Sequence, residues 1–357
     1  MSEAIGSTSS NGRLVSGGFG CLVKKIFLVA LTVLALGLPL LAQDSPAPLR
    51  LVRTIPLSVD GRLDHLSADV KGMRLFVAAL GNNSVEVIDL RAGQVIRGIT
   101  GPQKPQGVWY VEGLKKLFVA SGNDGMCRVY DGGTLALIES IKLDLGTDLV
   151  GYNPRKKLLY VGYGGEDAKK DFGNVAIIDA RNNKHIGDIR TKVHPGGILV
   201  DELGRHIYIT LPATSEVAVI DAGSNQITKS WEAVEAKRTV AFALDTANSR
   251  LFVGTRTPGH IIVYDTRSFK KVADFQAVGL LDSMFFDARR KRLYVTGGEG
   301  FIDVFQQRDA DHYSSLARIP TRPIARTSLF VPELNRFYVA LPRKDNQSAE
   351  IRVYEPQ

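Results

Sequence analysis

Leu293-Tyr294-Val295-Thr296-Gly297 is the clearest copy of a short motif that decides the fold of this 357-residue chain. In each copy an aromatic residue follows an aliphatic or aromatic residue and precedes a β-branched one. The motif aromatics are Phe76, Phe118, Tyr160, Tyr208, Phe252, Tyr294 and Tyr338. Their spacings of 42, 42, 48, 44, 42 and 44 residues indicate one small unit repeated seven times.

A second anchor follows each aromatic and consists of an apolar pair that usually ends in aspartate, as in Val87-Ile88-Asp89 and Val219-Ile220-Asp221. Turn formers such as Gly81-Asn82-Asn83 separate the two anchors, and further short β-branched runs flank them. The pattern predicts four short strands per unit, which is the composition of a propeller blade. We expect the anchor aspartates to bond to turn backbone within each blade.

The two ends of the repeat region complement each other. The last unit stops after a third strand at Ile351–Tyr354, and residues 49–60 offer the missing fourth strand. Their pairing would close the ring and leave no exposed edge. We therefore predict an all-β, seven-bladed β-propeller with four-stranded antiparallel blades as a single domain over residues 43–357. The alternative is an open solenoid with an independent N-terminal strand.

The aromatic-Val start and the Val-Ile-Asp end of each blade resemble those of the YVTN-repeat (YncE-like) seven-bladed β-propeller proteins of bacteria. The resemblance covers about residues 49–357 and is closest at Tyr294-Val295-Thr296-Gly297. It implies the propeller architecture and a location in the cell envelope. It implies little about chemistry, because one fold can host many activities.

The sequence predicts that residues 1–42 form a leader with a Sec-type signal peptide. Lys24-Lys25 precede an apolar core at 26–41, and Ala42 offers a small residue for cleavage. The sequence thus predicts a periplasmic or secreted protein that meets the membrane only through an uncleaved leader. The mature chain keeps a net charge of +6 and one thiol, Cys127, which we expect to be a buried small hydrophobe. The chain contains no Cys-x-x-Cys-His, which excludes covalent haem c.

The excess of basic residues gathers in short clusters. Lys115-Lys116, Arg155-Lys156-Lys157 and Arg289–Arg292 lie just before motif aromatics, so we expect them on one rim of the propeller. Such a rim would suit phosphate backbones or an anionic surface. The simpler interpretation is that these are solvated turn residues.

Counting back from the motif aromatics locates candidate channel residues. Eight and ten residues before the aromatic the positions are nearly all apolar, and we expect them in the channel wall. Twelve residues before it the same strand face becomes polar and should lie at the channel mouth. The candidate ligand-binding residues there, with three neighbours, are Asp64, His65, Gln106, Asp148, His194, Arg238, Asp282 and Arg326.

These residues at the channel mouth are compatible with several hypotheses. Asp64, Asp148 and Asp282 would suit a divalent cation such as Ca or Mg, and adding histidines would suit Mn or Zn. Alternatively the ring holds an anionic or sugar-like ligand. It could also perform catalysis, with His65, His194 and Arg326 as the candidate catalytic residues. The remaining reading is structural, with the polar groups bonded to backbone and water.

Two other segments carry potential ligands. The third blade has a glycine-rich insertion at 162–173, which suits a lid, a partner loop or a tolerated surface insertion. Asp309-Ala310-Asp311-His312 combines oxygen and imidazole donors, but its position after a second anchor places it in an outer loop.

Three functions are compatible with these features. The first is an exported binding module that holds a small ligand, glycan or protein partner of the cell envelope at the channel mouth or rim. The alternative is a metal-assisted hydrolase or lyase, similar to propeller lactonases and streptogramin lyases, that uses the Asp/His/Arg ring. The third is nucleic-acid binding, as a DNA-binding propeller, which the modest charge and the lack of basic-aromatic interleaving make weakest.

Overall fold

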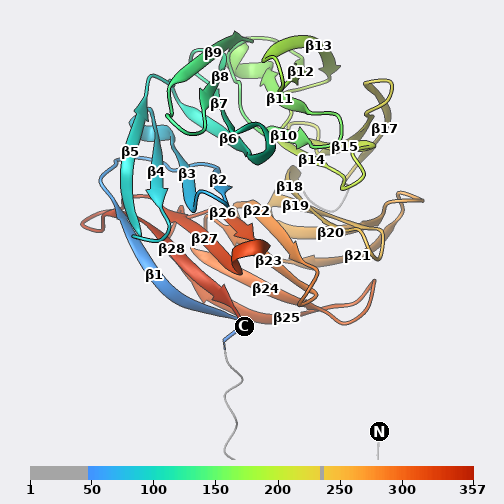
Figure 1. The fold of residues 1–357 in the computed structure, drawn as a ribbon. Coiled ribbons are helices and arrows are strands. Elements are labelled where there is room, and N and C mark those ends of the chain that lie inside the picture. Colours follow the sequence, from blue (N-terminus) through green and yellow to red (C-terminus); the bar gives the residue numbers. More distant parts are fainter. Residues whose placement is uncertain (1–46, 234–236) are drawn as a thin grey trace, which may run out of the picture. The chain divides into compact units, whose positions relative to one another are not determined.

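The computed structural model describes residues 47–233 and 237–357, which lie within one compact unit, Pro46–Gln357. The predicted leader at 1–42 lies outside the described residues. Seven four-stranded antiparallel sheets surround a central axis, so the predicted seven-bladed β-propeller is confirmed (Figure 1). Among the described residues no helix is long and apolar enough to span a membrane.

Each blade contributes four strands in radial order. The innermost strands are β2 (Leu66–Asp69), β6 (Pro105–Val111), β10 (Val150–Asn153), β14 (Gly197–Val200), β18 (Lys237–Asp245), β22 (Leu281–Asp287) and β26 (Thr327–Val331). The second strands are β3 (Arg74–Ala79), β7 (Lys116–Ser121), β11 (Leu158–Gly164), β15 (His206–Leu211), β19 (Arg250–Thr257), β23 (Arg292–Gly297) and β27 (Arg336–Leu341). The third strands are β4 (Ser84–Asp89), β8 (Met126–Asp131), β12 (Gly173–Asp179), β16 (Glu216–Asp221), β20 (Gly259–Asp265), β24 (Phe301–Gln307) and β28 (Ala349–Pro356). The outermost strands are β5 (Gln94–Thr100), β9 (Leu137–Lys142), β13 (Lys184–Thr191), β17 (Gln226–Glu232), β21 (Lys271–Gln276), β25 (Tyr313–Pro320) and β1 (Leu49–Leu57).

In the described part of the chain, four short 3₁₀ turns occur in the connections. They are η1 (Leu80–Asn82), η2 (Glu112–Leu114), η3 (Gly165–Ala168) and η4 (Pro332–Leu334).

The N-terminal strand closes the ring as predicted. β1 runs antiparallel to β28, from Leu49 opposite Pro356 to Leu57 opposite Ala349, and so becomes the outermost strand of the last blade. Figure 1 shows β1 in blue beside β28 in red, close to the C-terminus. The strand ends at Leu57, three residues before the predicted boundary at residue 60.

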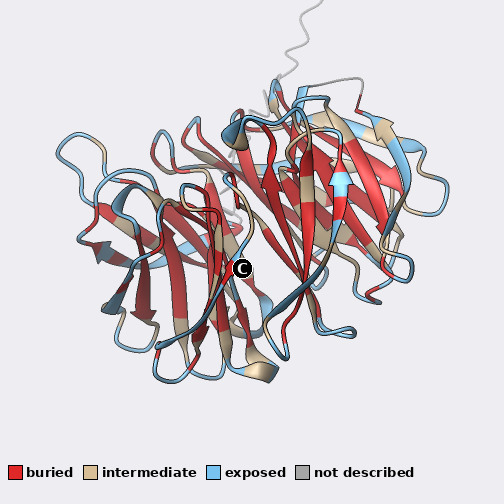
Figure 2. Cartoon of the chain, turned by 90° about the horizontal axis from the view of Figure 1, so that it is seen from above, coloured by how far each residue is buried: buried red, intermediate tan, exposed pale blue. Residues whose placement is uncertain are grey.

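The motif aromatics hold neighbouring blades together. Each one belongs to an apolar cluster shared with the innermost strand of the next blade. Phe76 stacks on Tyr110 with ring centroids 5.4 Å apart, and Phe252 stacks on Phe286 at 5.5 Å. Tyr338 of the last blade packs with Leu66 of the first, which continues the pattern around the ring. Buried positions accordingly run along the strands, whereas turns are largely exposed (Figure 2).

The residues eight and ten positions before each aromatic line the channel as predicted, except Ala68 and Tyr110, and several of them also pack between blades. Tyr110, Tyr152, Phe286 and Phe330 all fill the space against the preceding blade. Of these four, Tyr152, Phe286 and Phe330 also border the channel. The physical reason is that the blades stand face to face, so both faces of an innermost strand meet a neighbouring blade or the axis.

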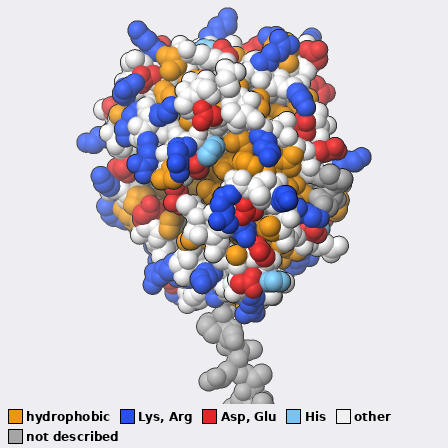
Figure 3. All heavy atoms as spheres, turned by 90° about the vertical axis from the view of Figure 1, so that its right-hand side faces the viewer, with side chains coloured by type: hydrophobic (Ala, Val, Ile, Leu, Met, Phe, Trp, Pro, Cys, Tyr) orange, Lys and Arg blue, Asp and Glu red, His pale blue; other side chains and the backbone are white. Residues whose placement is uncertain are grey.

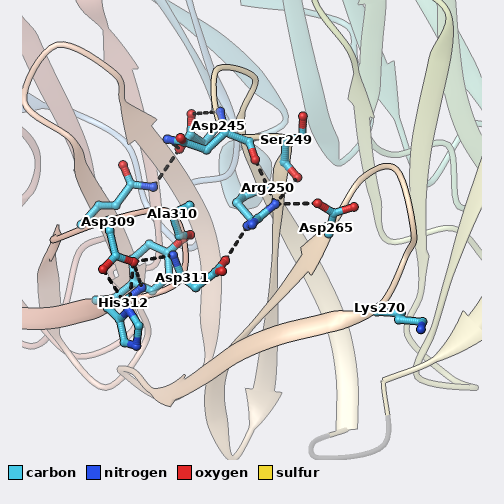
Figure 4. Close-up of polar contacts among 12 residues, drawn as sticks. Asp245, Ser249, Arg250, Asp265, Lys270, Asp309, Ala310, Asp311 and His312 are labelled. Atoms are coloured by element: carbon cyan, nitrogen blue, oxygen red, sulfur yellow. Dashed lines mark hydrogen bonds and ion pairs between the residues drawn. The ribbon is translucent and has the colours of Figure 1, made fainter.

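Basic residues at the turns between the innermost and second strands, called the inner turns below, connect several blades to the following one. Lys116 Nζ donates to Ala180 O (3.0 Å) and Arg181 O (2.9 Å) in the next blade. Arg250 Nε pairs with Asp311 at 2.7 Å across the following interface (Figure 4). Equivalent contacts between blades join Arg53 to Leu90, Arg74 to Gly132, Lys156 to Ala222 and Arg292 to Gln357. Several predicted rim cations therefore stabilise blade interfaces.

We expect Lys116→Met to lower the free energy of unfolding by about 2 kcal/mol, because two carbonyl oxygens lose a charged donor. The neighbouring exposed Lys115 provides a matched control, and Lys115→Met should change stability by less than about 0.5 kcal/mol. Urea denaturation of both variants measures the difference. Equal effects of the two substitutions would show that the hydrogen bonds from Lys116 to the next blade do not contribute to stability.

Other local predictions are confirmed. The anchor aspartates bond to turn backbone: Asp89 accepts from Arg91 N at 2.7 Å and Asp221 from Ser224 N at 2.7 Å. These bonds lower the pKa of both carboxyls. Cys127 is fully buried, and burial raises the pKa of its thiol to about 12. The Asp309–His312 segment forms an exposed outer turn in which Asp309 accepts from the backbone of Asp311 and His312 (Figure 4).

Candidate functional site

An axial cavity of about 450 Å³ runs between the innermost strands of all seven blades. Its wall is largely apolar and includes Val150, Ile198, Phe242, Met284 and Leu329. Ser283 and Ser328 also line it, but their hydroxyls are engaged: Ser283 Oγ accepts from Ser328 N at 3.1 Å, and Ser328 Oγ accepts from Thr296 at 2.8 Å. The channel therefore presents mainly hydrocarbon surface to an occupant.

Charged residues gather where the innermost strands begin. Asp64 lies just before β2, Asp148 just before β10, and Asp282 near the start of β22. His65 and Asp282 contribute directly to the wall of the channel. The region around these residues is called the mouth below. It lies at the opposite end of the innermost strands from Glu202, which follows β14 and also lines the channel.

Asp64 is nearly inaccessible and faces the side chains of Arg62 and His65. Arg62 Nη2 lies 2.8 Å from Asp64 Oδ2, and His65 Nε2 lies 3.7 Å from Oδ1. Burial raises the pKa of Asp64 to about 6, although His65 and Arg62 lower it. The carboxylates of Asp148 and Asp282 contribute to the rise, which shows that the three acidic residues share one electrostatic environment.

Asp148 pairs with His194 across the mouth of blades three and four. Their Nε2 and Oδ2 atoms are 3.8 Å apart, and His194 Nδ1 donates to Gly164 O at 3.1 Å. Burial opposes ionisation of Asp148, but His194, His65 and Arg62 outweigh it, and its pKa is lowered. Burial also lowers the pKa of His194, yet the attraction of the Asp148 carboxylate and the hydrogen bond to Gly164 outweigh it, and the net shift is upward.

Asp282 lies between two arginines. Arg326 Nε is 2.7 Å from Asp282 Oδ2, and the Arg256 guanidinium contacts Oδ1. Burial lowers the pKa of Arg326, Asp282 raises it, and the nearby cations Arg62 and Arg256 lower it further. The mouth thus combines three aspartates with three arginines and two histidines.

The structure brings six of the predicted ligand-binding residues into this mouth: Asp64, His65, Asp148, His194, Asp282 and Arg326. Gln106 is buried beside them, and its backbone oxygen accepts from His65 N at 3.3 Å. Arg238 does not join them. It is exposed on β18, and among the described residues no contact links its side chain to the three aspartates.

Two functional residues were missed, Arg62 and Arg256. Arg62 lies fourteen residues before Phe76, the same count that placed His194 and Arg238, so the repeat could have identified it. Arg256 lies four residues after Phe252, near the end of β19, and no pattern in the sequence directs it toward Asp282.

The insertion of blade three is fixed beside the mouth. Lys170 Nζ of the insertion lies 2.6 Å from Asp144 Oδ2, and Asp167 Oδ2 of the insertion lies 3.3 Å from Lys104 Nζ. Gly164 of the insertion accepts a hydrogen bond from His194 Nδ1 through its backbone oxygen. These contacts make the segment a part of the rim on the side of blades two and three.

The predicted divalent cation site is not supported by any group of donors. Among residues 47–233 and 237–357, no three His, Cys, Asp or Glu side chains lie close enough together to hold a metal ion. Each aspartate of the mouth instead contacts one or more cationic side chains.

Comparisons with known proteins identify the fold alone. One solved chain, from a crystal structure of the mitotic checkpoint complex, is 14% identical with a TM-score of 0.73, over 94% of this chain and 99% of that one. A second, from *Kuenenia stuttgartiensis* hydrazine synthase, is 17% identical with a TM-score of 0.71, over 84% and 97%. No family model matches the chain, and no curated protein matches it. The class that fold and channel define is the seven-bladed β-propeller.

Proposed function

We propose that this chain is an exported, non-enzymatic binding module of the YVTN-repeat type that holds a small ligand in its axial channel. The observation that carries the proposal is the 450 Å³ cavity, which is lined by all seven blades and bordered at one end by His65 and Asp282. Ligand sites in proteins are commonly cavities of about 300–1,000 Å³ with apolar walls and a few polar groups. The signal-like leader supports a location in the periplasm or outside the cell.

A binding function accounts for the contacts at the mouth better than a metal-assisted hydrolase or lyase function does. A general base or a metal ligand needs a carboxylate with free lone pairs. Asp64 and Asp282 are instead held by arginines, and Asp148 faces His194. These pairs are suited to fixing the shape and charge of an entrance.

Nucleic-acid binding has less support. Basic inner-turn residues such as Lys116 and Arg292 donate to backbone carbonyls of the next blade. On the face shown in Figure 3, Lys and Arg side chains are interspersed with acidic and apolar ones and form no continuous stripe. A phosphate backbone is best matched by a continuous basic surface.

A neutral fluorescent probe tests the proposal. N-phenyl-1-naphthylamine becomes bright in apolar surroundings, and we expect saturable, one-to-one binding to residues 43–357 in the micromolar range. Leu199→Trp and Leu329→Trp place bulk at two partly exposed positions of the channel wall and should weaken binding at least tenfold. Leu137→Trp, on the outer strand β9 with 55% exposure, is the matched control and should bind like the wild type.

Circular dichroism melts confirm that each of these variants is folded. Absence of saturable binding, or equal binding by folded channel variants and wild type, would contradict a ligand site in the channel.

A further inference from the structure

Each carboxylate of the mouth is less accessible than its own partner, although Asp148, 22% exposed beside His194 at 28%, is as accessible as Arg256 and Arg326. The Arg62 side chain is 42% exposed, whereas its partner Asp64 is 3% exposed. Around Asp282, which is 8% exposed, Arg256 and Arg326 are 21% and 20% exposed. A molecule that approaches the channel from this end therefore meets the guanidiniums before it meets Asp64 or Asp282.

These cations are also crowded. The guanidinium of Arg326 experiences Arg62 and Arg256 as like charges, in addition to the attraction of Asp282 and Asp64. His65 and His194 add imidazole donors at the same entrance. An anionic group placed here would reduce the mutual repulsion of the guanidiniums and accept charge-assisted hydrogen bonds from them.

The two ends of the channel differ in charge. Glu202 borders the far end with an exposed side chain, together with Trp109 and Pro332. A second anionic group at that end would be repelled, whereas an apolar end could contact the Trp109 ring. The wall between the two ends is apolar, and its Ser283 and Ser328 hydroxyls are already hydrogen-bonded.

We propose that the channel binds an amphipathic monocarboxylate, with its carboxylate at Arg326 and Arg62 and its apolar body between the innermost strands. This inference rests on the proposed function, and it adds the chemical class and the orientation of the ligand. Charge complementarity selects the head group, and burial of hydrocarbon against the channel wall supplies affinity in proportion to the length of the body.

Competition among three ten-carbon probes tests the class. Decanoate, decanol and decylammonium share one tail and differ only in the head group, and each is titrated against bound N-phenyl-1-naphthylamine. We expect decanoate to displace the probe at a concentration roughly ten- to a hundredfold lower than decanol, as charge-assisted hydrogen bonds provide. Decylammonium should be the weakest of the three.

Substitutions at the mouth test the orientation. Arg326→Gln should weaken decanoate at least tenfold and leave decanol within about threefold. Arg62→Gln, at a more exposed position, should also weaken decanoate binding. This second variant keeps the test valid if Arg326→Gln does not fold. Arg267→Gln is the matched control, because Arg267 is 75% exposed in the turn after β20. Thermal melts of the variants verify folding.

The outcomes separate the two proposals. If N-phenyl-1-naphthylamine binds but decanoate and decanol compete equally, the monocarboxylate class is wrong and the binding module stands. Preference for decylammonium, or unchanged decanoate affinity in both folded arginine variants, would likewise overturn the assignment of the mouth. If the neutral probe does not bind at all, the proposed function itself fails.

Discussion

Removal of residues 47–57 is expected to lower the stability of the propeller more than any single substitution does. The truncation deletes β1, so that β28 becomes an unpaired edge and the last blade keeps three strands. Leu49, Ile55 and Leu57, each at most 3% exposed, leave the core with it. Their burial alone contributes about 5 kcal/mol, which corresponds to a fall in melting temperature of roughly 10 °C or more. Circular dichroism melts and size-exclusion chromatography measure the loss.

A circular permutant provides the control for this truncation. Gln357 N donates to Pro48 O at 3.1 Å, so the end of β28 and the start of β1 are adjacent. A chain that starts at the exposed Asp60, continues to Gln357 and returns through a short Gly-Ser linker to residues 47–59 retains β1. It should melt close to the wild type. A truncated chain as stable as the permutant would show that closure by β1 is unimportant.

The second large effect concerns the pH dependence of stability at Asp64. Burial raises the pKa of Asp64 to about 6 from an ordinary value of 3.8. The folded state therefore binds this proton more tightly than the unfolded state. The resulting stabilisation is complete below the unfolded pKa and is lost as pH rises through the folded value. This difference in pKa corresponds to about 2 kcal/mol of stability lost between pH 4 and pH 7.

Asp64→Asn removes this dependence. The free energy of unfolding of the variant minus that of the wild type should increase by about 2 kcal/mol from pH 4 to pH 7. His194, whose pKa is raised, and Asp148, whose pKa is lowered, titrate in both proteins, so the subtraction largely removes them. Urea denaturation at four pH values gives the curves, with Asp309→Asn as an exposed control. A difference that stays constant with pH would contradict a buried Asp64 carboxyl.

The fold could be predicted because its main determinant is repeated seven times. A single aromatic such as Phe76 says little, but seven at nearly constant spacing imply one unit that packs against its own copy. The backbone conformation of the inner turns was harder to predict from the sequence. Lys115, Lys157 and Lys291 adopt left-handed conformations with φ of 49°, 59° and 53°. Glycine would signal such a turn, whereas lysine does not.

The candidate site was partly predictable for the same reason. Counting from the motif placed Asp64, Asp148 and Asp282 at the mouth, because the innermost strands occupy equivalent positions in successive blades. The count failed at Arg238. β18 extends to Lys237 and shifts its register against β19 between Thr239 and Ala241, so alternation by two no longer predicts the direction of the side chain. Arg256 depends on how the chain continues beyond its motif, which periodicity does not encode.

The ties between blades have an evolutionary consequence. Lys116, Lys156 and Arg292 recognise main-chain oxygens of the adjoining unit, which every amino acid carries. The acceptor side can therefore diverge freely while the contact survives. A gene segment of one period that is duplicated or lost would still meet compatible partners on both sides. Propellers built in this way can change the number of their repeats by recombination without first acquiring compensating substitutions.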